Sequence, residues 1–571
     1  FFFYFDWAPW QIGVSLASID PEPPRLRRQT GRLVRIFGLV GGFVAILAAT
    51  LHGLLRGDWY EAALAGIALG MAMLPEEFPV VLAVFMAMGA WRISKARVLT
   101  RQAAAIESLG SATVLCTDKT GTLTQNRMAV QAIRLDGETV VTGPGSTGEG
   151  LADPELREAV LCGLMASAPR PADPMDVAFH DLAGRLGLAP VGADGAPLQL
   201  VHTFGLRRDL LAVTQLWRES AGNGDLIAVA KGAPEAVFVL CQLPEAATAR
   251  LHFEATEMAA AGLRVLGLAR AHLPAGSHLS EELPSDPRDI GFSFVGLAGL
   301  GDPLRDSVPA AVADCHAAGI RVVMITGDYP ATAASIARLA GLAEGGVVTG
   351  DEIAAMDDAA LTGALKSATV IARVMPEQKL RIIEALKAAG ETVAMTGDGV
   401  NDAPSLRAAH VGIAMGGRGT DVAREASGIV LLDDDFGSIA QAIRQGRRIY
   451  DNLQKAMAFI LAVHVPIAGT ALLPLFLDLP FVLGPLHIAL MEMIIDPVCA
   501  LVFEAEGEER DVMRRPPRDP AAPLYPTRLA IQSALTGLAA FGAVAGVYLW
   551  SVEQGIAPDD LRALTFLTLI L

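Results

Sequence analysis

The chain has 571 residues, a net charge of −17 and a pI near 5.1, which disfavour a protein that binds the phosphate backbone of nucleic acids. Hydrophobic residues make up 52% of the sequence, charged residues only 19%, and the mean hydropathy is +0.41, so the composition predicts a multidomain membrane protein. The 5 cysteines are far apart and form no C-x-x-C pair, which excludes a disulfide framework and a thiolate metal cluster.

Long apolar runs predict where the chain crosses a bilayer. The predicted spans cover about 36–55, 60–91, 456–477, 481–503 and 529–550, and a truncated one begins near 561. Lys and Arg cluster beside the spans on one side, so the positive-inside rule predicts a cytoplasmic loop from about 92 to 454. The first ten residues lack the basic start of a cleavable signal, and both ends of the chain fall inside expected structure, so we expect a fragment.

Four short β-prone runs in the loop each lead to a polar turn. The turns are D-K-T-G-T-L-T at 118–124, T-G-D at 326–328, P-E-Q-K at 376–379 and T-G-D-G-V-N-D at 396–402. Because open α/β sheets bind ligands at the carboxyl ends of their strands, we expect these turns to share one site. An aspartate, a hydroxyl, a lysine and a carboxylate pair suit phosphoryl transfer to the aspartate, with Mg²⁺ binding the oxygens.

From about residue 14 onward, the sequence resembles the P-type ATPase family, and its calcium-pump-like bacterial branch in particular. The resemblance implies an α-helical transmembrane bundle and an α/β haloacid dehalogenase-like, Rossmann-type phosphorylation domain with an inserted α+β nucleotide-binding domain. The implied boundaries are a membrane hairpin at 1–101, a phosphorylation domain at 102–126 and 302–452, a nucleotide-binding domain at 127–301, and further spans at 453–571. It also implies that an actuator domain and two more membrane helices precede Phe1.

The resemblance also assigns roles to the polar turns. ATP phosphorylates Asp118, and Asp118, Thr120 and Asp398 bind Mg²⁺. The remaining residues of the implied catalytic site, which bind the phosphoryl group or complete the motifs, are Lys119, Thr326, Gly327, Lys379, Asn401 and Asp402. Soluble phosphatases of this superfamily have a second aspartate two residues after the nucleophile, where this chain has Thr120. Without that general acid and base the aspartyl phosphate is expected to persist, as a pump requires.

Other motifs resemble the nucleotide pocket of the family. The segment K-G-A-P-E at 231–235 implies that Lys231 and Gly232 lie beside ATP, and Phe204 matches an aromatic residue that stacks on adenine. Arg208 and Arg264 match arginines that contact phosphate. Phe204 alone fits an ordinary core aromatic equally well.

Carboxylates within the predicted spans indicate a cation path, because such groups are costly in lipid. The motif L-P-E-E-F-P at 74–79 is expected to leave the carbonyls of Met71 and Pro75 free beside Glu76, because prolines lack an N–H. This motif resembles the P-E-G-L-P of calcium-type pumps, in which Glu76 is the matching ligand. Glu492 and Asp496, four residues apart, share a helix face and match cation ligands of the family. Glu77 and His464 are further candidates, and His464 is as often a structural residue in such a place.

The sequence therefore predicts an ATP-driven pump in a bacterial plasma membrane, with ATP, Mg²⁺, lipid and the transported cation as its partners. Oxygen-rich ligands favour one Ca²⁺, with Mn²⁺ or another divalent cation as an alternative. A pump for a monovalent cation or for protons, a membrane-tethered phosphatase, a lipid transporter and a nonenzymatic scaffold remain alternatives. No nucleic-acid partner is expected, and the oligomeric state is unknown.

Overall fold

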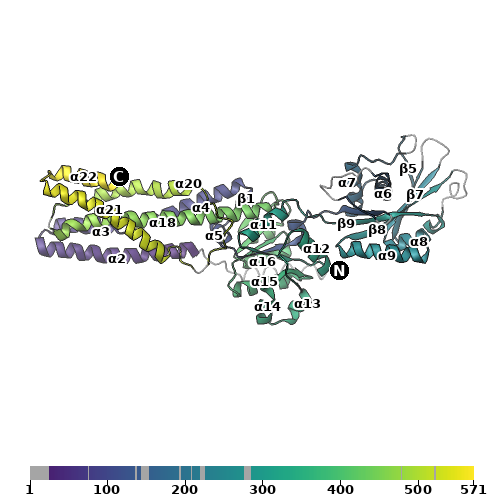
Figure 1. Cartoon of the computed structure of the whole chain (residues 1–571), viewed down its shortest axis with the longest axis horizontal. Helices are drawn as coiled ribbons and strands as arrows, with labels where there is room; N and C mark the ends of the chain where they lie inside the picture. The colour runs from purple at the N-terminus through teal and green to yellow at the C-terminus, as the bar shows by residue number, and fades with distance from the viewer. Residues whose placement is uncertain are drawn as a thin grey trace. The chain divides into compact units, whose positions relative to one another are not determined.

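The computed structural model describes residues 25–571 except 75, 136–137, 143–152, 192–194, 208, 219–224, 275–283, 478 and 520–521. The chain divides into two compact units, and each is described by itself. The first comprises Phe1–Cys116, Ala313–Val322 and Lys379–Leu571, and the second comprises Thr117–Val312 and Val323–Gln378. Figure 1 colours the chain by residue number and labels its elements.

The described residues of the first unit contain 5 candidate membrane spans, which are long and apolar enough to cross a membrane. These candidate spans are Arg28–Leu54, Trp59–Lys95, Gly437–Leu477, Pro485–Ala505 and Thr527–Glu553. They lie within helices α2 (Arg25–Arg56), α3 (Trp59–Ala72), α4 (Glu77–Lys95), α18 (Gly437–Leu477), α19 (Pro485–Pro497), α20 (Phe503–Ala505) and α21 (Thr527–Glu553). A further helix, α22 (Pro558–Ile570), follows them. Figure 1 shows α2 beside α3 and α18 beside α21, and these pairs are in contact.

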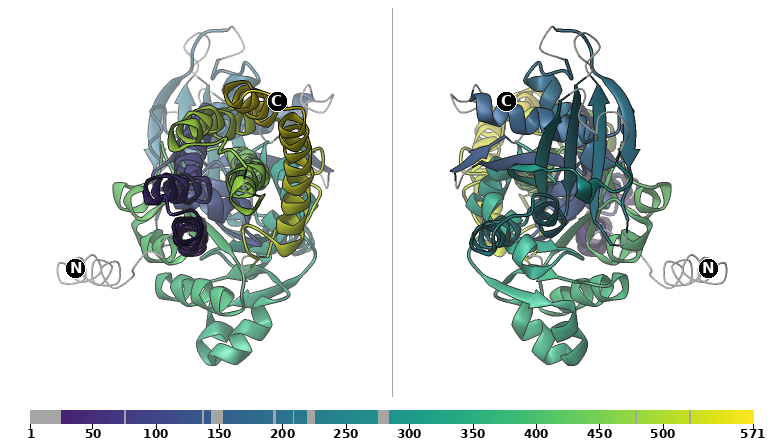
Figure 2. Two further views of the ribbon diagram at one scale, coloured as in Figure 1. Left: turned by 90° about the vertical axis from the view of Figure 1, so that its left-hand side faces the viewer. Right: turned by 90° about the vertical axis from the view of Figure 1, so that its right-hand side faces the viewer.

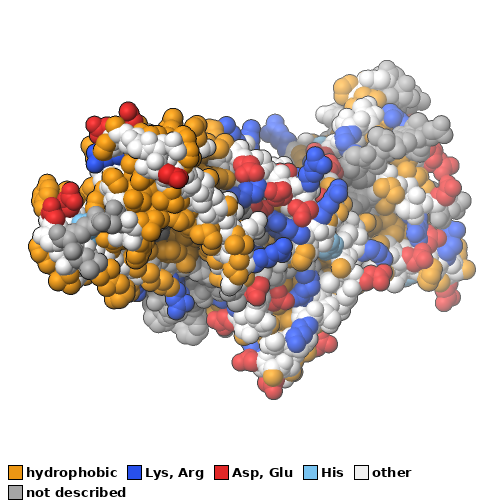
Figure 3. All heavy atoms as spheres, turned by 60° about the vertical axis from the view of Figure 1, so that its left-hand side comes forward, with side chains coloured by type: hydrophobic (Ala, Val, Ile, Leu, Met, Phe, Trp, Pro, Cys, Tyr) orange, Lys and Arg blue, Asp and Glu red, His pale blue; other side chains and the backbone are white. Residues whose placement is uncertain are grey.

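Apolar side chains cover the outside of this helical bundle, as expected for a surface that faces lipid. Figure 3 shows them as a nearly continuous orange area over the helices. Exposed members include Leu39, Phe43 and Ile46 on α2 and Leu535 and Leu538 on α21. The sequence-based spans thus correspond to helices, although α18 begins about 19 residues before the predicted span, at Gly437.

The run predicted as one span at 60–91 is two helices. Helix α3 ends at Ala72 and α4 begins at Glu77, with Pro79 in the first turn of α4, where a missing N–H disrupts no helical hydrogen bond. The expectation of a free Met71 carbonyl is wrong, because the chain turns tightly after α3 and the Leu74 N–H donates to that oxygen at 3.1 Å. Pro75, whose carbonyl was also expected to be free, lies outside the described residues.

An eight-stranded sheet has the order β1-β15-β14-β13-β2-β10-β12-β11, and the division between the two units passes through its strands β2 and β10. Its strands are β1 (Val98–Thr100), β2 (Val114–Asp118), β10 (Arg321–Ile325), β11 (Gly346–Thr349), β12 (Ala368–Ala372), β13 (Val393–Gly397), β14 (Val411–Met415) and β15 (Ile429–Leu431). β13 pairs in parallel with both β2 and β14, and only the pairing of β1 with β15 is antiparallel among the described pairs. β12, β13 and β14 are buried along their whole length, as expected for strands covered on both faces.

The second sheet, in the second unit, has seven antiparallel strands in the order β4-β3-β9-β8-β7-β6-β5, seen side by side in the right-hand view of Figure 2. The strands are β3 (Ala129–Leu135), β4 (Glu138–Val141), β5 (Gln199–Phe204), β6 (Ala212–Arg218), β7 (Leu226–Gly232), β8 (Arg264–Leu273) and β9 (Ser293–Gly301). Side chains of β7 alternate between two cores. Ile227 and Val229 pack with helices α6 (Pro154–Met165) and α7 (Pro174–Arg185), whereas Leu226 and Ala228 pack with α8 (Pro234–Leu240).

Candidate functional site

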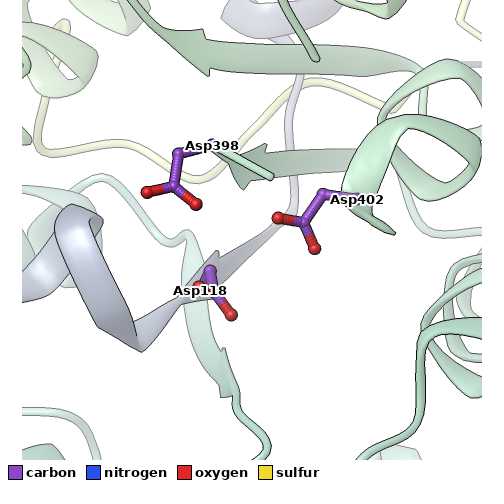
Figure 4. Close-up of side chains that lie close together, drawn as sticks. All are labelled: Asp118, Asp398 and Asp402. Carbon is purple, nitrogen blue, oxygen red and sulfur yellow. The ribbon is translucent and has the colours of Figure 1, made fainter. Parts of the chain in front are cut away.

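The register of the parallel sheet brings three aspartates together. Cys116 of β2 lies opposite Met395 of β13, so the carboxyl ends of these neighbouring strands meet, and Asp118 and Asp398 follow there. Asp402 comes from the 3₁₀ turn Val400–Asp402 that continues from β13. Ligand oxygens of Asp118, Asp398 and Asp402 all lie within 4.8 Å of one another, and Figure 4 shows the three side chains close together. The sequence predicted that these residues share one site but gave Asp402 no part in metal binding.

Lys379 brings positive charge to one member of this carboxylate cluster. Its ammonium lies 2.7 Å from Oδ1 of Asp402, which is 4% exposed. Burial raises the pKa of Asp398, and the negative charge of Asp402 raises it further. Three carboxylates this close repel one another unless a cation joins them, and hard oxygen donors of this kind suit Mg²⁺. The residues present therefore fit the expected metal.

The loop after Asp118 has a backbone that requires its glycine. Thr120 is extended (φ −73°, ψ 128°), and Gly121 has φ +74°, a left-handed conformation that favours glycine. Arg305 donates from Nη2 to the Gly121 carbonyl at 2.9 Å, which holds this turn in place. The Thr124 hydroxyl donates to Asp302 at 2.6 Å, and Thr124 also forms a β-bridge with Leu304. From the sequence, 302–305 was expected only to begin the second part of the phosphorylation domain. Its contacts with Gly121 and Thr124 were not predicted.

The other predicted phosphoryl-binding residues lie at neighbouring strand ends. Thr326 directly follows β10, which neighbours β2, and its hydroxyl accepts from the Asp328 N–H at 3.2 Å. Asp328 also forms an ion pair with Lys119 at 2.5 Å, a partner that sequence reasoning missed although T-G-D was noted. Gly327 and Asn401 are exposed at the surface of their turns.

In the second unit, Lys231 contacts three residues that were not predicted as its partners from the sequence. Its ammonium donates to the Ser167 hydroxyl at 2.6 Å and forms an ion pair with Asp176, at the start of α7. It also lies 5.1 Å from the centre of the Phe179 ring. Burial lowers the pKa of Lys231, although the Asp176 carboxylate acts in the opposite direction. The motif D-P-M-D at 173–176, with its helix-capping aspartate, was the only local signal for this partner.

The remaining nucleotide candidates lie at one edge of the seven-stranded sheet. Phe204 ends β5, Gly232 ends β7 and Arg264 begins β8, and the antiparallel register places these ends together. Phe204 is half-buried and meets the His202 ring edge-on at 4.5 Å, whereas Arg264 is exposed. A Cβ on Gly232 would lie 2.3 Å from the Leu211 carbonyl oxygen, so the close strand approach needs glycine. Arg208 lies outside the described residues.

The membrane carboxylates gather between helices of the first unit. The Glu77 side chain is 0% exposed, and neither of its oxygens has a hydrogen-bond partner in the described part of the chain. Its Oε1 lies 3.7 Å from Nε2 of His464 on α18. Glu76, which the sequence favoured, is exposed just before α4 begins. Asp496 on α19 has a buried oxygen, Oδ1, that also lacks a partner among the residues described, and the charges of Glu76, Glu77 and Asp496 all act on Glu492.

Two family matches cover separate parts of this arrangement. Residues 206–410 match the haloacid dehalogenase-like hydrolases, and residues 480–571 match the C-terminus of cation transporting ATPases. The chain is 35% identical to the probable cation-transporting ATPase F of Mycobacterium tuberculosis, over 90% of this chain and 61% of the relative. It is 30% identical to the calcium-transporting ATPase of Bacillus subtilis, over 98% of this chain and 66% of the relative.

The chain belongs to the P-type cation-transporting ATPases. It spans about 61% of the length of its mycobacterial relative. Among solved structures, a zinc-transporting PIB-type ATPase in the E2.Pi state has a TM-score of 0.59 over 88% of this chain and 66% of that chain, at 23% identity. At this identity the likeness shows the fold. The predicted P-type ATPase family and fold class are thereby confirmed. The chain belongs to an integral membrane protein, in keeping with its candidate membrane spans.

Proposed function

We propose that the full-length protein containing this chain couples ATP hydrolysis to transport of a divalent cation across a membrane, through phosphorylation of Asp118. The observation that supports this most is the convergence of Asp118, Asp398 and Asp402 within 4.8 Å, next to the ammonium of Lys379. Such a cluster can hold a metal ion and a phosphoryl group at the same carboxylate.

In the proposed reaction, an oxygen of Asp118 attacks the terminal phosphorus of ATP, the bond to the bridging oxygen breaks, and ADP leaves. Water later attacks the phosphorus of the aspartyl phosphate, the bond to the Asp118 oxygen breaks, and dihydrogen phosphate leaves. Lys379, the Thr326 hydroxyl and the Gly327 N–H bind the phosphoryl oxygens, in keeping with their places at strand ends. Lys119 and Asn401 support the two turns to which they belong.

Asp118, Thr120 and Asp398 are the proposed Mg²⁺ ligands, and the position of Asp402 adds it to this set. When bound, Mg²⁺ supplies the positive charge that draws carboxylate and phosphoryl oxygens together. Thr120 has no carboxylate to act as a general acid or base, which favours a lasting aspartyl phosphate and a pump over a phosphatase.

ATP is proposed to bind at the sheet edge that carries Phe204, Gly232 and Arg264, with Arg208 nearby in sequence. Lys231 contributes from the same end of β7, and its buried ion pair with Asp176 keeps its position fixed. An aromatic side chain, a glycine that allows close approach and basic groups suit adenine and phosphate.

The transported cation is proposed to bind among Glu76, Glu77, Glu492 and Asp496, next to His464. Carboxylate oxygens favour Ca²⁺ or Mn²⁺, and the Bacillus subtilis relative is named a calcium-transporting ATPase. The positive-inside pattern and the bacterial relatives support a plasma membrane location with the 92–454 loop in the cytoplasm.

Phosphoenzyme formation tests this function. The full-length protein is incubated with ATP labelled on its terminal phosphate, Mg²⁺ and one added cation at a time, then quenched in acid. We expect a hydroxylamine-sensitive label that requires Ca²⁺ or Mn²⁺ and that is absent in Asp118→Asn. Label that requires a monovalent cation or low pH would favour the alternative pumps, and no label under any condition would overturn the proposal.

A further inference from the structure

The membrane site contains a carboxylate and an imidazole that face each other without bonding. Oε1 of Glu77 and Nε2 of His464 lie 3.7 Å apart, beyond the length of a hydrogen bond. The two side chains are 0% and 11% exposed, so solvent has little access to the space between them. Their closest atoms are both able to donate a lone pair to a metal ion.

The second nitrogen of His464 fixes which atom carries the hydrogen. Nδ1 lies 2.8 Å from the carbonyl oxygen of Ile460, one turn earlier on α18. A carbonyl oxygen can only accept, so Nδ1 carries the hydrogen and donates it. In the neutral ring, Nε2 then presents its lone pair toward Glu77. Metal-binding histidines are commonly held this way, with the other nitrogen donating to a carbonyl.

When it is ionised, Glu77 needs a cation, which the residues described by the structure do not supply as a hydrogen-bonded partner. Both of its oxygens are buried and have no hydrogen-bond partner among the described residues. A buried carboxylate without a partner is strongly unfavourable, and Oδ1 of Asp496 adds a second buried oxygen in the same condition. A neutral His464 ring, in the tautomer above, does not offset this charge.

We propose that Nε2 of His464 and Oε1 of Glu77 bind the transported cation together, and that this cation is a first-row transition-metal dication, Mn²⁺ foremost, rather than Ca²⁺. The inference rests on the proposed transport function and specifies its substrate. It assigns to His464 a direct part in choosing the cation.

Ligand geometry allows one ion to bind both atoms, and ligand chemistry supports the choice of cation. Two ligands held about 2.0–2.6 Å from one metal ion at an angle of 90–110° lie roughly 3–4 Å apart, which includes the observed 3.7 Å, so one ion can touch both atoms. Ca²⁺ takes six to eight oxygen ligands, whereas imidazole nitrogen suits first-row transition metals, and the carboxylates around it favour Mn²⁺ among these. Carboxylates as the other ligands disfavour Cu⁺, which prefers sulfur.

Pulsed electron paramagnetic resonance of Mn²⁺ bound to the full-length protein, without nucleotide, tests for the nitrogen ligand directly. We expect ¹⁴N modulation of the Mn²⁺ signal in the wild type, and its loss in both His464→Asn and His464→Gln. His487→Asn is the matched control, because His487 is also in a membrane helix, α19, but its Nδ1 accepts from the Gly484 N–H at 3.2 Å. The modulation should survive in this control. Glu77→Gln should weaken Mn²⁺ binding at least tenfold.

Cation dependence of phosphoenzyme formation gives a second readout. The Mn²⁺ concentration for half-maximal labelling of Asp118 should rise at least tenfold in His464→Asn, while the Ca²⁺ concentration changes less than threefold. Bound Mn²⁺ without ¹⁴N modulation, modulation that persists in both His464 variants, or wild-type labelling that responds to Ca²⁺ and not to Mn²⁺ would each overturn the inference. Those results would leave the pump itself standing, whereas absence of label with every cation would overturn the proposed function.

Discussion

Gly110 and Gly446 lie backbone against backbone where helix α5 (Ala103–Gly110) crosses α18. A Cβ on Gly110 would lie 2.7 Å from the Gly446 carbonyl carbon, and a Cβ on Gly446 would lie 2.7 Å from the Ile106 carbonyl oxygen. Neither neighbour is a flexible side chain, so the backbone itself has to move to admit a methyl group. The two glycines therefore set the distance between α5, which leads into β2 and Asp118, and the long helix that carries His464.

Gly446→Ala should destabilise the protein by about 1–3 kcal/mol, because overpacking a tight contact forces backbone shifts. Thermal unfolding of the full-length protein measures this as a lower Tm. The matched control is Gly542→Ala in α21, where a Cβ meets nothing within 4 Å. That variant should keep or slightly raise the Tm, because alanine favours helix. Equal Tm values for both variants would contradict the prediction.

Arg447→Gln should also lower the Tm, because this buried guanidinium satisfies backbone carbonyls from distant segments. It donates to Ala318 at 2.8 Å, to Val512 at 2.9 Å and to Arg515 at 2.8 Å. Leaving such buried acceptors unsatisfied costs about 1–3 kcal/mol each. Arg444→Gln, one turn earlier at an exposed ion pair with Glu508, should change the Tm little. A larger effect at Arg444 would refute this account.

Replacing the partly buried carboxylate Asp398 should stabilise the metal-free protein at neutral pH. Its pKa is raised by burial and by Asp402, so the folded state favours the protonated form. The contribution of Asp398 to the free energy of unfolding is therefore fully present below the ordinary pKa of an aspartate. It is lost as the pH rises from that value through the raised pKa of the folded state. In EDTA, Asp398→Asn should have a higher Tm than wild type at pH 7, and the difference should shrink near pH 4.

Added Mg²⁺ should reverse that comparison, because the wild type gains stability by binding the metal and the variant loses a ligand. The control is Asp351→Asn, at a side chain that is 88% exposed, which should follow the wild type at each pH. An Asp398→Asn protein less stable than wild type in EDTA at pH 7 would contradict the expected direction of the effect.

Lys231→Met should destabilise the protein by about 3–5 kcal/mol, because it leaves the Asp176 carboxylate in a largely buried place without its counter-charge. The two side chains are 7% and 18% exposed. The double variant Lys231→Met with Asp176→Leu should recover much of the loss, since no charge remains there. A double-mutant cycle measured by denaturant unfolding isolates the interaction between Lys231 and Asp176. If the two single variants lost free energy of unfolding in a strictly additive way, the interaction would be ruled out.

Thr120→Asp should shorten the life of the aspartyl phosphate on Asp118. It restores an acid and base two residues after the nucleophile, and general acid–base catalysis contributes about 10²–10⁴-fold. Labelled phosphoenzyme chased with unlabelled ATP measures the decay, with Thr120→Asn as a control of similar size. Equal decay rates in both variants would show that a side chain at position 120 does not activate the water that attacks the aspartyl phosphate.

The sequence predicted that Asp118, Asp398 and Asp402 lie close together, because they follow buried strands and parallel strands bring their carboxyl ends to one edge. From apolar length it also predicted where the membrane helices lie, except that 60–91 is two helices and α18 begins before its predicted span. It failed where a partner is distant in sequence and carries no motif, as with Asp176 for Lys231 and Arg305 for the Gly121 turn. The sequence favoured Glu76 as a cation ligand, and that stays a prediction. It could not show that Glu77 is the enclosed carboxylate of the two, because this depends on how α4 restarts after the break.

Thr124 is hydrogen-bonded to Asp302 and forms a β-bridge with Leu304. These contacts hold together the two ends of the segment formed by residues 125–301. Because the two ends are held together, the length of the segment between them has little influence on the loop that holds Asp118. The entropic cost of closing a longer loop grows only slowly with its length. Residues 125–301 can therefore vary in length and in the sequence away from the proposed ATP site without moving the loop that holds Asp118, as long as both ends keep these contacts.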